Sequence, residues 1–130
     1  MEEHLRENEI SYEIRKAIFA VYNTFGPGLL ESVYERALCL ELKRSGLNFR
    51  RQVAVPVFYN GENLNLGFRL DILVEDLVIV EIKSVEDLAE VHHKQVLTYL
   101  KLANKKLGLL VNFNTNDMSK SIFRKVNGLT

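Results

Sequence analysis

The stretch DILVEDLVIVEIK, residues 71–83, contains two apolar runs separated by a short acidic turn. Residues 77–82 are apolar except for Glu81, which is typical of a strand covered on both faces. We therefore expect this strand to be central in a sheet. Asp71, Glu81 and Lys83 do not fit such surroundings, because a buried and unpaired charge is costly. These charges need a partner, a metal ion or water.

The length of the turn decides whether the charges meet. Residues on one face of a strand share parity, and a hairpin keeps directly opposed residues on the same face. An odd loop, such as residues 75–77, puts Asp71 opposite Glu81, whereas a two-residue turn would put them on opposite faces. With the odd loop, Asp71 and Glu81 become cross-strand neighbours, and Lys83 follows one step along the strand.

Length and composition favour one soluble domain over residues 1–130 with one core. The chain is 47% hydrophobic and 26% charged, and no segment approaches the roughly 20 apolar residues that span a bilayer. Residues 1–10 are charged and lack the apolar region of a secretory signal. The only cysteine, Cys39, cannot form an internal disulfide, so we expect a cytoplasmic location.

The overall charge gives no general attraction to nucleic acid. Lys plus Arg and Asp plus Glu number 17 each, so nucleic-acid binding would need a local patch. Two basic groups are candidates, and they comprise Lys43, Arg44, Arg50 and Arg51, and Lys101, Lys105 and Lys106. Cations near helix C-termini also interact favourably with the helix dipole, which is the simpler explanation.

The pattern along the chain predicts an α/β (α+β) domain with a mixed sheet. Hydrophobic spacing and breakers predict helices over about 10–25, 29–45 and 85–105, and strands over 53–57, 64–74, 77–82, 107–113 and 121–126. Pro56 indicates an edge strand or a bulge, and Asn60-Gly61 predicts a hairpin turn. Ser84 with Asp87 resembles a capping box that would begin the third helix.

Two polar residues occupy unexpected places on the predicted helices. On a helical wheel, Leu38 and Leu42 flank Glu31 by about 20° on either side, so Glu31 faces inward. It is either a functional carboxylate or a boundary residue that pairs with an arginine. Gln95 falls in the centre of the apolar stripe of the third helix, either with a functional role or with its amide satisfied by backbone groups.

The expected cluster of Glu31, Asp71 and Glu81 favours a divalent cation. Carboxylates gathered in one partly buried place repel one another unless a cation holds them ionised. Oxygen ligands with water suit Mg²⁺ or Mn²⁺, whereas zinc prefers histidine or cysteine. Cys39 and the adjacent His92 and His93 do not form a zinc pattern; we expect His92 to line the pocket and His93 to meet solvent.

Three motifs resemble a known family. Asp71, followed by Glu81-Ile82-Lys83 at a strand end, resembles the D…E-x-K signature of the PD-(D/E)xK nuclease superfamily. Gln95-x-x-x-Tyr99 resembles the Q-x-x-x-Y helix motif of its exonuclease-like branch. Residues 28–34, with the sequence GLLESVY, are similar to the name-giving motif of the small GxxExxY proteins. The resemblance extends from about residue 10 to residue 125 and includes the order of the elements.

The resemblance implies a restriction-endonuclease-like core, in which a mixed central sheet with an antiparallel meander is flanked by helices. It also implies roles for the site residues: Asp71, Glu81 and the Ile82 carbonyl would ligate Mg²⁺, with Glu31 helping directly or through water; Lys83 would act on the attacking water and the phosphate; and Gln95 and Tyr99 would position water, Lys83 or the nucleic-acid backbone. Leu70 stands where the signature has proline.

Together these features predict a Mg²⁺-dependent nuclease, with Mn²⁺ as a substitute ion, that hydrolyses DNA or, as a second choice, RNA. The alternative is a catalytically silent module that keeps the fold and binds nucleic acid or a protein partner. A third interpretation makes all six polar residues structural. Arg69 could contact a phosphate or pair with Glu81 or Glu31, so it stays outside the catalytic set. A homodimer would let two subunits grip a duplex.

Overall fold

The computed structural model describes residues 2–129. Its elements in chain order are α1 (Glu2–Phe25), α2 (Glu31–Arg44), β1 (Phe49–Tyr59), β2 (Glu62–Val74), β3 (Val78–Lys83), α3 (Glu90–Ala103), β4 (Leu107–Asn112), a short 3₁₀ helix (Met118–Lys120) and β5 (Ile122–Val126). This is the predicted order of three helices and five strands. Within residues 2–129, none of the helices combines the length and hydrophobicity that crossing a membrane requires.

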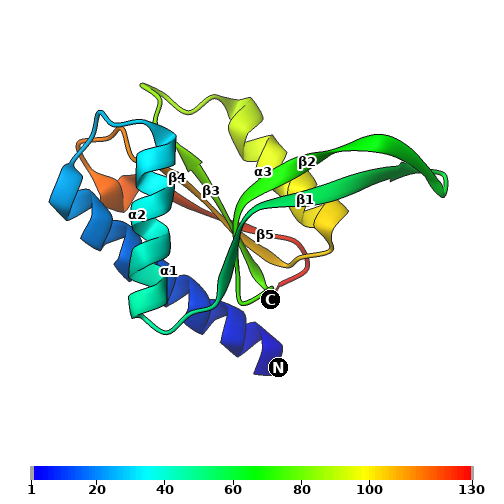
Figure 1. Ribbon diagram of the computed structural model, residues 1–130, viewed down its shortest axis with the longest axis horizontal. Coiled ribbons are helices and arrows are strands. Elements are labelled where there is room, and N and C mark those ends of the chain that lie inside the picture. The colour runs from blue at the N-terminus through cyan, green and yellow to red at the C-terminus, as the bar shows by residue number, and fades with distance from the viewer. Residues whose placement is uncertain (1, 130) are drawn as a thin grey trace.

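The five strands form one mixed sheet in the order β1-β2-β3-β4-β5 (Figure 1). β1, β2 and β3 make an antiparallel meander, β3 and β4 are parallel, and β5 returns antiparallel to β4. Parallel neighbours need a crossover connection, and α3 supplies it. β3 is therefore central, which confirms the prediction made from its apolar run, and the fold is the expected α+β arrangement.

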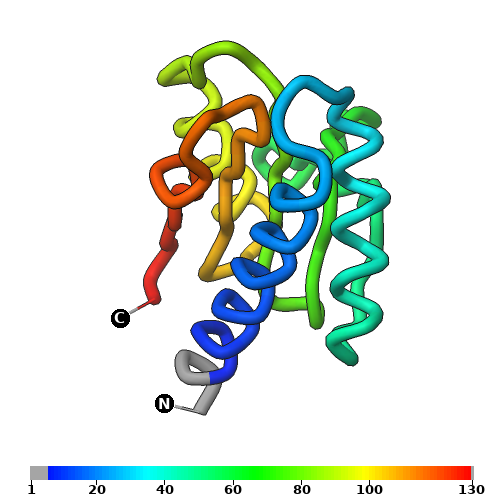
Figure 2. The backbone as a smooth tube through the Cα atoms, turned by 90° about the vertical axis from the view of Figure 1, so that its left-hand side faces the viewer, coloured from blue at the N-terminus to red at the C-terminus, as the bar shows by residue number. Residues whose placement is uncertain are grey.

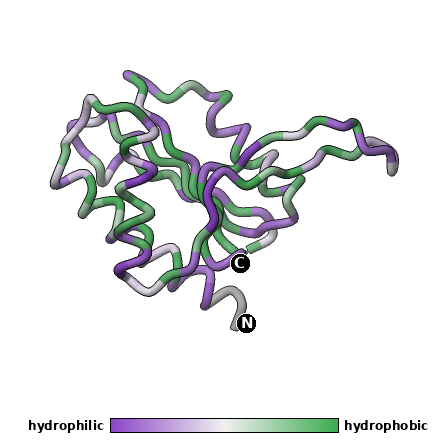
Figure 3. The backbone as a smooth tube through the Cα atoms, in the orientation of Figure 1, coloured by the Kyte–Doolittle hydropathy of each residue, from purple (hydrophilic) through white to green (hydrophobic). Residues whose placement is uncertain are grey.

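Helices cover both faces of the sheet (Figures 1 and 2). α1 and α2 pack on Val78, Val80 and Ile82 of β3, whereas the buried Leu100 of α3 packs on Ile79 from the other side. Alternate residues of one strand thus serve two apolar layers, as the period of two requires. Figure 3 shows the resulting band of hydrophobic backbone through the centre of the molecule. Glu81 and Lys83 share the parity of Ile79 and therefore belong to the face that α3 covers.

The outer parts of β1 and β2 extend beyond the body of the sheet as a two-stranded arm (Figure 1). Asn60 and Gly61 close it as a two-residue turn in which both residues have positive φ, of 50° and 82°, as a type I′ hairpin requires. β1 is an edge strand, and its register shifts between Pro56 and Phe58. The predictions of a hairpin turn and of an edge strand or bulge at Pro56 are confirmed.

The third helix begins later than predicted. α3 starts at Glu90 instead of about Val85, so the capping box expected at Ser84 is wrong. The Ser84 N–H donates to the Glu31 carboxylate, and Val85 is held at both its N–H and its carbonyl by the buried Asn112 side chain. Because these backbone groups have tertiary partners, residues 84–89 form a loop without losing hydrogen bonds.

Candidate active site

The turn between β2 and β3 has the odd length that the parity argument required. Its three residues are Glu75, Asp76 and Leu77, and the register pairs Val74 with Val78 and Ile72 with Val80. Glu75 and Asp76 have φ of 53° and 57°, and the Leu77 N–H donates to the Val74 carbonyl, which closes the turn. Continued by one residue, the same register places Asp71 opposite Glu81.

At Asp71 and Glu81 the two strands are joined by hydrogen bonds from backbone N–H groups to side-chain carboxylates, where a regular ladder would have backbone carbonyls as acceptors. The ladder pairing of β2 with β3 ends at Ile72 and Val80. Beyond it, the Asp71 N–H donates to Glu81 Oε2 at 2.8 Å, and the Ile82 N–H donates to Asp71 Oδ2 at 2.8 Å. Each side chain thus satisfies a backbone donor of the other strand. The two carboxylates are thereby fixed side by side where the strands separate.

A distortion on the opposite strand accompanies this arrangement. Gln52 of β1 lies where the β1–β2 register would place the partner of Asp71, but the paired residues pass from Arg51↔Ile72 to Val53↔Leu70. Gln52 has a φ of 51°, and its carbonyl accepts a hydrogen bond from Arg69 Nη1 at 3.1 Å. The Asp71 N–H is consequently left to the Glu81 carboxylate. Arg69 binds a backbone carbonyl, and the predicted pairing of Arg69 with Glu81 or Glu31 is not seen.

Burial and mutual repulsion make both carboxyls hard to ionise. The pKa of Glu81 is raised from 4.5 to about 8, chiefly by burial and then by the negative charge of Asp71. The pKa of Asp71 is also raised, again chiefly by burial, while the Ile82 N–H and the Lys83 ammonium act to lower it. The positive charge of Lys83 therefore reaches both carboxyls. This pair would bind a cation favourably, because a cation relieves the repulsion.

Tyr99 of α3 lies close enough to Asp71 and Glu81 for their charges to affect its pKa. Its pKa is raised by burial and then by the charges of Glu81 and Asp71, while the Gln95 side chain acts to lower it. The Tyr99 ring stacks on Phe68 of the arm, with ring centroids 4.1 Å apart. Gln95 itself is exposed, so the predicted burial at the centre of the α3 stripe is wrong. The α3 residues that reach the core are Val96 and Leu100.

Glu31 reaches the end of β3 from the opposite helix layer. Its Oε2 accepts the Ser84 N–H at 3.1 Å, directly after Lys83, but the residue is exposed instead of facing inward as predicted. In the part of the chain that the structure describes, no group of three or more His, Cys, Asp or Glu side chains is placed to hold a metal ion. The predicted gathering of three carboxylates is therefore reduced to Asp71 and Glu81, with Glu31 nearby.

Sequence reasoning missed Glu35, whose charge affects the pKa values of Asp71 and Glu81 more than the charge of Glu31 does. Glu35 is 6% exposed, accepts hydrogen bonds from Arg51 and Gln52, and raises the pKa of both Asp71 and Glu81. Its Oε2 lies 2.7 Å from Arg51 Nη2. The spacing of four residues from Glu31 to Glu35, which puts both on one helix face, was the signal that could have found it.

Both histidines make contacts that the sequence did not predict. His92 Nδ1 accepts the Ala89 N–H at 3.0 Å and so caps the first turn of α3. His93, expected in solvent, is half-buried and packs edge-on against Phe123 of β5, with ring centroids 4.8 Å apart. Neither contact belongs to the carboxylate pair.

Comparison with known proteins places this geometry in a family. The model of the PD-(D/E)XK nuclease superfamily matches residues 8–125, which include both carboxylates and Lys83. The chain belongs to the PD-(D/E)XK nuclease superfamily. A search of curated proteins gave no match.

A solved structure shares the fold of this superfamily member. It is described as the crystal structure of SSO0001, with 21% sequence identity and a TM-score of 0.57. The alignment covers 98% of this chain and 63% of that chain, so this chain spans less than two thirds of its length. The similarity supports the restriction-endonuclease-like arrangement of sheet and helices.

PD-(D/E)XK nucleases generally use divalent metals, and the donor atoms of this member suit one. Asp71 Oδ2 and Glu81 Oε2 each hold a backbone N–H, while Asp71 Oδ1 and Glu81 Oε1 accept no hydrogen bond from the described residues. No buried side-chain oxygen of the described part lacks a partner, so these two oxygens reach solvent. Two carboxylate oxygens open to water are the kind of ligands that hard divalent cations take.

Proposed function

We propose that the chain is a metal-dependent nuclease of the GxxExxY type that hydrolyses phosphodiester bonds of DNA, with RNA as a second substrate class. One observation carries the proposal: Asp71 and Glu81 are locked side by side by reciprocal hydrogen bonds, with raised pKa values and with the charge of Lys83 beside them. A structural ion pair would instead show a carboxylate held ionised by its partner. The family match supports the reaction class.

The residues of the chain then divide the work. Asp71, Glu81 and the Ile82 carbonyl would hold Mg²⁺, or Mn²⁺ in its place, and Glu31 would act at one remove through water. A bound divalent ion lowers the pKa of water and offsets negative charge on the phosphate in the transition state. Lys83 orients the attacking water and stabilises the phosphate charge, because its positive charge acts on both carboxyls of the pair.

Tyr99 and Gln95 act as a positioning unit. The stack of Tyr99 on Phe68 holds the phenol near both carboxyls, and the Gln95 side chain acts on the pKa of the same phenol. Because Gln95 is exposed, its amide can contact the nucleic-acid backbone while it orients Tyr99. We expect Tyr99→Phe to slow cleavage less than removal of Lys83 does, because the ring packing is preserved.

The test is a panel of single- and double-stranded DNA and RNA, incubated with Mg²⁺, Mn²⁺ or EDTA. We expect cleavage only with metal, and a loss of at least about a hundredfold for Asp71→Ala and for Lys83→Ala. Lys94→Ala is the matched control, because Lys94 lies on the surface of α3 and only pairs with Glu90. Metal-dependent binding without cleavage would favour the silent module, and Lys83→Ala with full activity would refute the assigned role.

A further inference from the structure

A cavity of about 560 Å³ lies beside the loop that follows β3 and is separate from the carboxylate pair. Loop 84–89 contributes Glu86 and Asp87, the loop after β4 contributes Asn114 and Asn116, and the side chain of Phe123 also lines it. Cavities that bind small ligands commonly measure about 300 to 1,000 Å³. The cavity is therefore large enough for one planar heterocycle.

The two loops around the cavity are fixed to a single buried side chain. Asn112, at the end of β4, accepts the N–H groups of Val85 and Asn114 with its Oδ1 and donates to the Val85 carbonyl with its Nδ2. Asn112 also lines the cavity, at its base between the two loops. This single amide sets the spacing of the two walls, so the cavity is formed before any ligand arrives.

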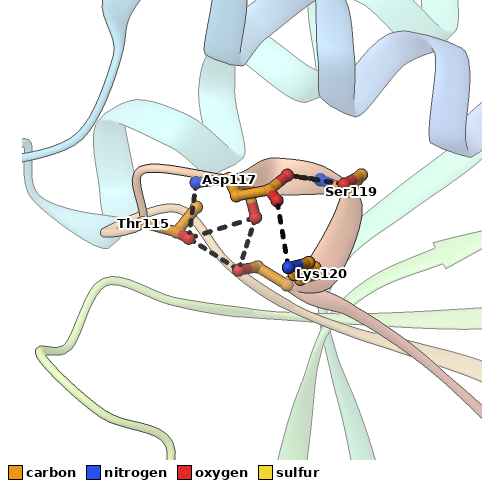
Figure 4. Close-up of polar contacts among 5 residues, drawn as sticks. Thr115, Asp117, Ser119 and Lys120 are labelled. Carbon is orange, nitrogen blue, oxygen red and sulfur yellow. Dashed lines mark hydrogen bonds and ion pairs between the residues drawn. The ribbon is translucent and has the colours of Figure 1, made fainter.

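Hydrogen bonds inside the second loop make that wall rigid (Figure 4). Thr115 Oγ1 accepts the Asp117 N–H at 3.1 Å and the Ser121 hydroxyl at 2.7 Å. Asp117 Oδ1 accepts both the N–H and the hydroxyl of Ser119. Thr115 and Ser121 line the cavity, but their hydroxyls already form hydrogen bonds within this network. They support the wall and leave recognition to other residues.

The other polar side chains of the lining are free to bind a ligand. Within the described part of the chain, the side chains of Glu86, Asp87, Asn114 and Asn116 take part in none of the hydrogen bonds or ion pairs, although all four line the cavity. The group therefore offers carboxylate acceptors together with amide donors and acceptors. Two carboxylates disfavour a phosphate in this place, so the ligand must present donors and no negative charge.

The cavity is within reach of a strand bound at the carboxylate pair. Glu86 follows Lys83 by three residues, which span at most about 11 Å. Consecutive phosphates of one strand are spaced by about 3.4 Å along a duplex, and single-stranded bases can be splayed out and read on their edges. A base a few nucleotides from the phosphate at Lys83 can therefore enter this cavity.

We propose that the cavity receives a guanine base of the strand held at the candidate active site, an inference that rests on the proposed nuclease function. Guanine presents N1–H and N2–H side by side, which match the two oxygens of one carboxylate, Asp87 or Glu86. Adenine and cytosine place a ring acceptor next to their amino group, and a carboxylate repels it. Asn114 and Asn116 can donate to guanine O6 and N7. His93 and Phe123, which contact each other edge-on, form the aromatic part of the lining.

The test uses deoxyguanosine, which carries no phosphate, and compares it with the other three deoxynucleosides. Binding is followed by NMR through the side-chain amide signals of Asn114 and Asn116. We expect deoxyguanosine alone to shift these signals at millimolar concentration, and the double variant Glu86→Gln/Asp87→Asn to weaken binding by about tenfold or more. Glu90→Gln is the control, because it changes a carboxylate outside the cavity, on the surface of α3.

Nucleoside binding is measured without cleavage. An inactive enzyme would therefore contradict the nuclease proposal, and the binding measurement would still test whether the cavity takes guanine. Asp71→Ala should keep deoxyguanosine binding while it abolishes cleavage. With active enzyme, a substrate carrying one guanine near the cut should lose its advantage over a guanine-free substrate in the double variant. Equal shifts with all four nucleosides, or unchanged binding by the double variant, would overturn the proposal.

Discussion

Asp71 and Glu81 replace one rung of the β2–β3 ladder with two carboxylates. The exchange keeps the backbone donors satisfied, since the Asp71 and Ile82 N–H groups both find an oxygen. It also leaves two carboxyls together in a partly buried place, where both pKa values are raised although the charge of Lys83 acts to lower them. The residues thus store an electrostatic cost in the free protein that a bound cation would remove.

The raised pKa of Glu81 predicts an unusual dependence of stability on pH in metal-free buffer. The folded protein keeps the proton up to about pH 8, whereas the unfolded chain loses it near 4.5. Between these values the native state binds more protons, so stability falls as pH rises, by at most about 1.4 kcal/mol per pH unit for one group. Urea unfolding with EDTA between pH 5 and pH 9 measures it. Glu81→Gln should flatten the slope, and an equal slope in both proteins would contradict the assignment.

The buried ion pair of Glu35 and Arg51 predicts that replacing Arg51 costs much more stability than replacing its neighbour Arg50. Arg51→Met leaves the Glu35 carboxylate buried, with only Gln52 as partner, and should lower the free energy of unfolding by about 3 kcal/mol. Arg50→Met is the matched control: the Arg50–Asp76 pair is exposed at both side chains, so its loss should cost less than about 1 kcal/mol. Chemical denaturation of both variants at pH 7 gives the comparison, and similar costs would show that burial does not matter at this pair.

At the scale of elements, the sequence was most informative where one rule decides the outcome. The parity argument correctly made the meeting of Asp71 and Glu81 depend on an odd loop, and the structure has that loop at residues 75–77; a one-residue change would have moved the two side chains to different faces. The apolar run of β3 likewise predicted a central strand. Both arguments use only local periodicity, and the first needed the length of one turn in addition.

The errors arose where a distant residue decided the outcome. Ser84 and Asp87 have the spacing of a helix start, but Asn112, far along the chain, takes the hydrogen bonds of Val85 and keeps the segment extended. On α3 the buried face is centred on Val96 and Leu100, and Gln95 lies at the surface together with Val91 and Leu102 of the predicted stripe. Glu35 looked like an ordinary helix residue because its partners come from β1. The spacing from Glu31 to Glu35 indicates a shared helix face, but no periodic pattern reveals the distant hydrogen-bond partners Arg51 and Asn112.

The arm formed by β1 and β2 predicts a steric requirement at Gly67. A Cβ added there would lie 2.1 Å from the Val55 carbonyl oxygen, a backbone atom that cannot move aside alone. Gly67→Ala should therefore destabilise the protein by about 1 to 3 kcal/mol or shift the pairing of the arm. Leu66→Ala is the control, since Leu66 is exposed on the same strand. Thermal unfolding measures both, and a harmless Gly67→Ala would show that the two strands separate easily there.

At the scale of the whole molecule, the candidate site lies where separate parts of the fold meet. β2 and β3 supply the carboxylates, α2 brings Glu31 and Glu35 from one layer, and α3 brings Tyr99 from the other. No single element could place these groups together, which is why the site depends on the complete fold. The apolar side chains at Phe58, Tyr59, Leu64 and Leu66 of β1 and β2 are exposed, and the homodimer that we predict from the sequence could use this surface.

Because the site links several elements, a cation bound there should stabilise the entire fold. A ligand that binds only the native state adds about 2.7 kcal/mol when its concentration is one hundred times its Kd. We expect Mg²⁺ or Mn²⁺ to raise the Tm at pH 7.5, and EDTA to reverse the rise. Asp71→Asn should abolish the metal-dependent rise, and its own metal-free Tm should equal or exceed that of the wild type, because the amide removes a carboxyl whose ionisation is opposed by burial and can still accept the Ile82 N–H. Asp117→Asn is the control carboxylate, distant from the pair, and should keep the rise. A Tm that rises equally in the Asp71 variant would place the cation elsewhere and remove the physical basis of the proposed hydrolysis.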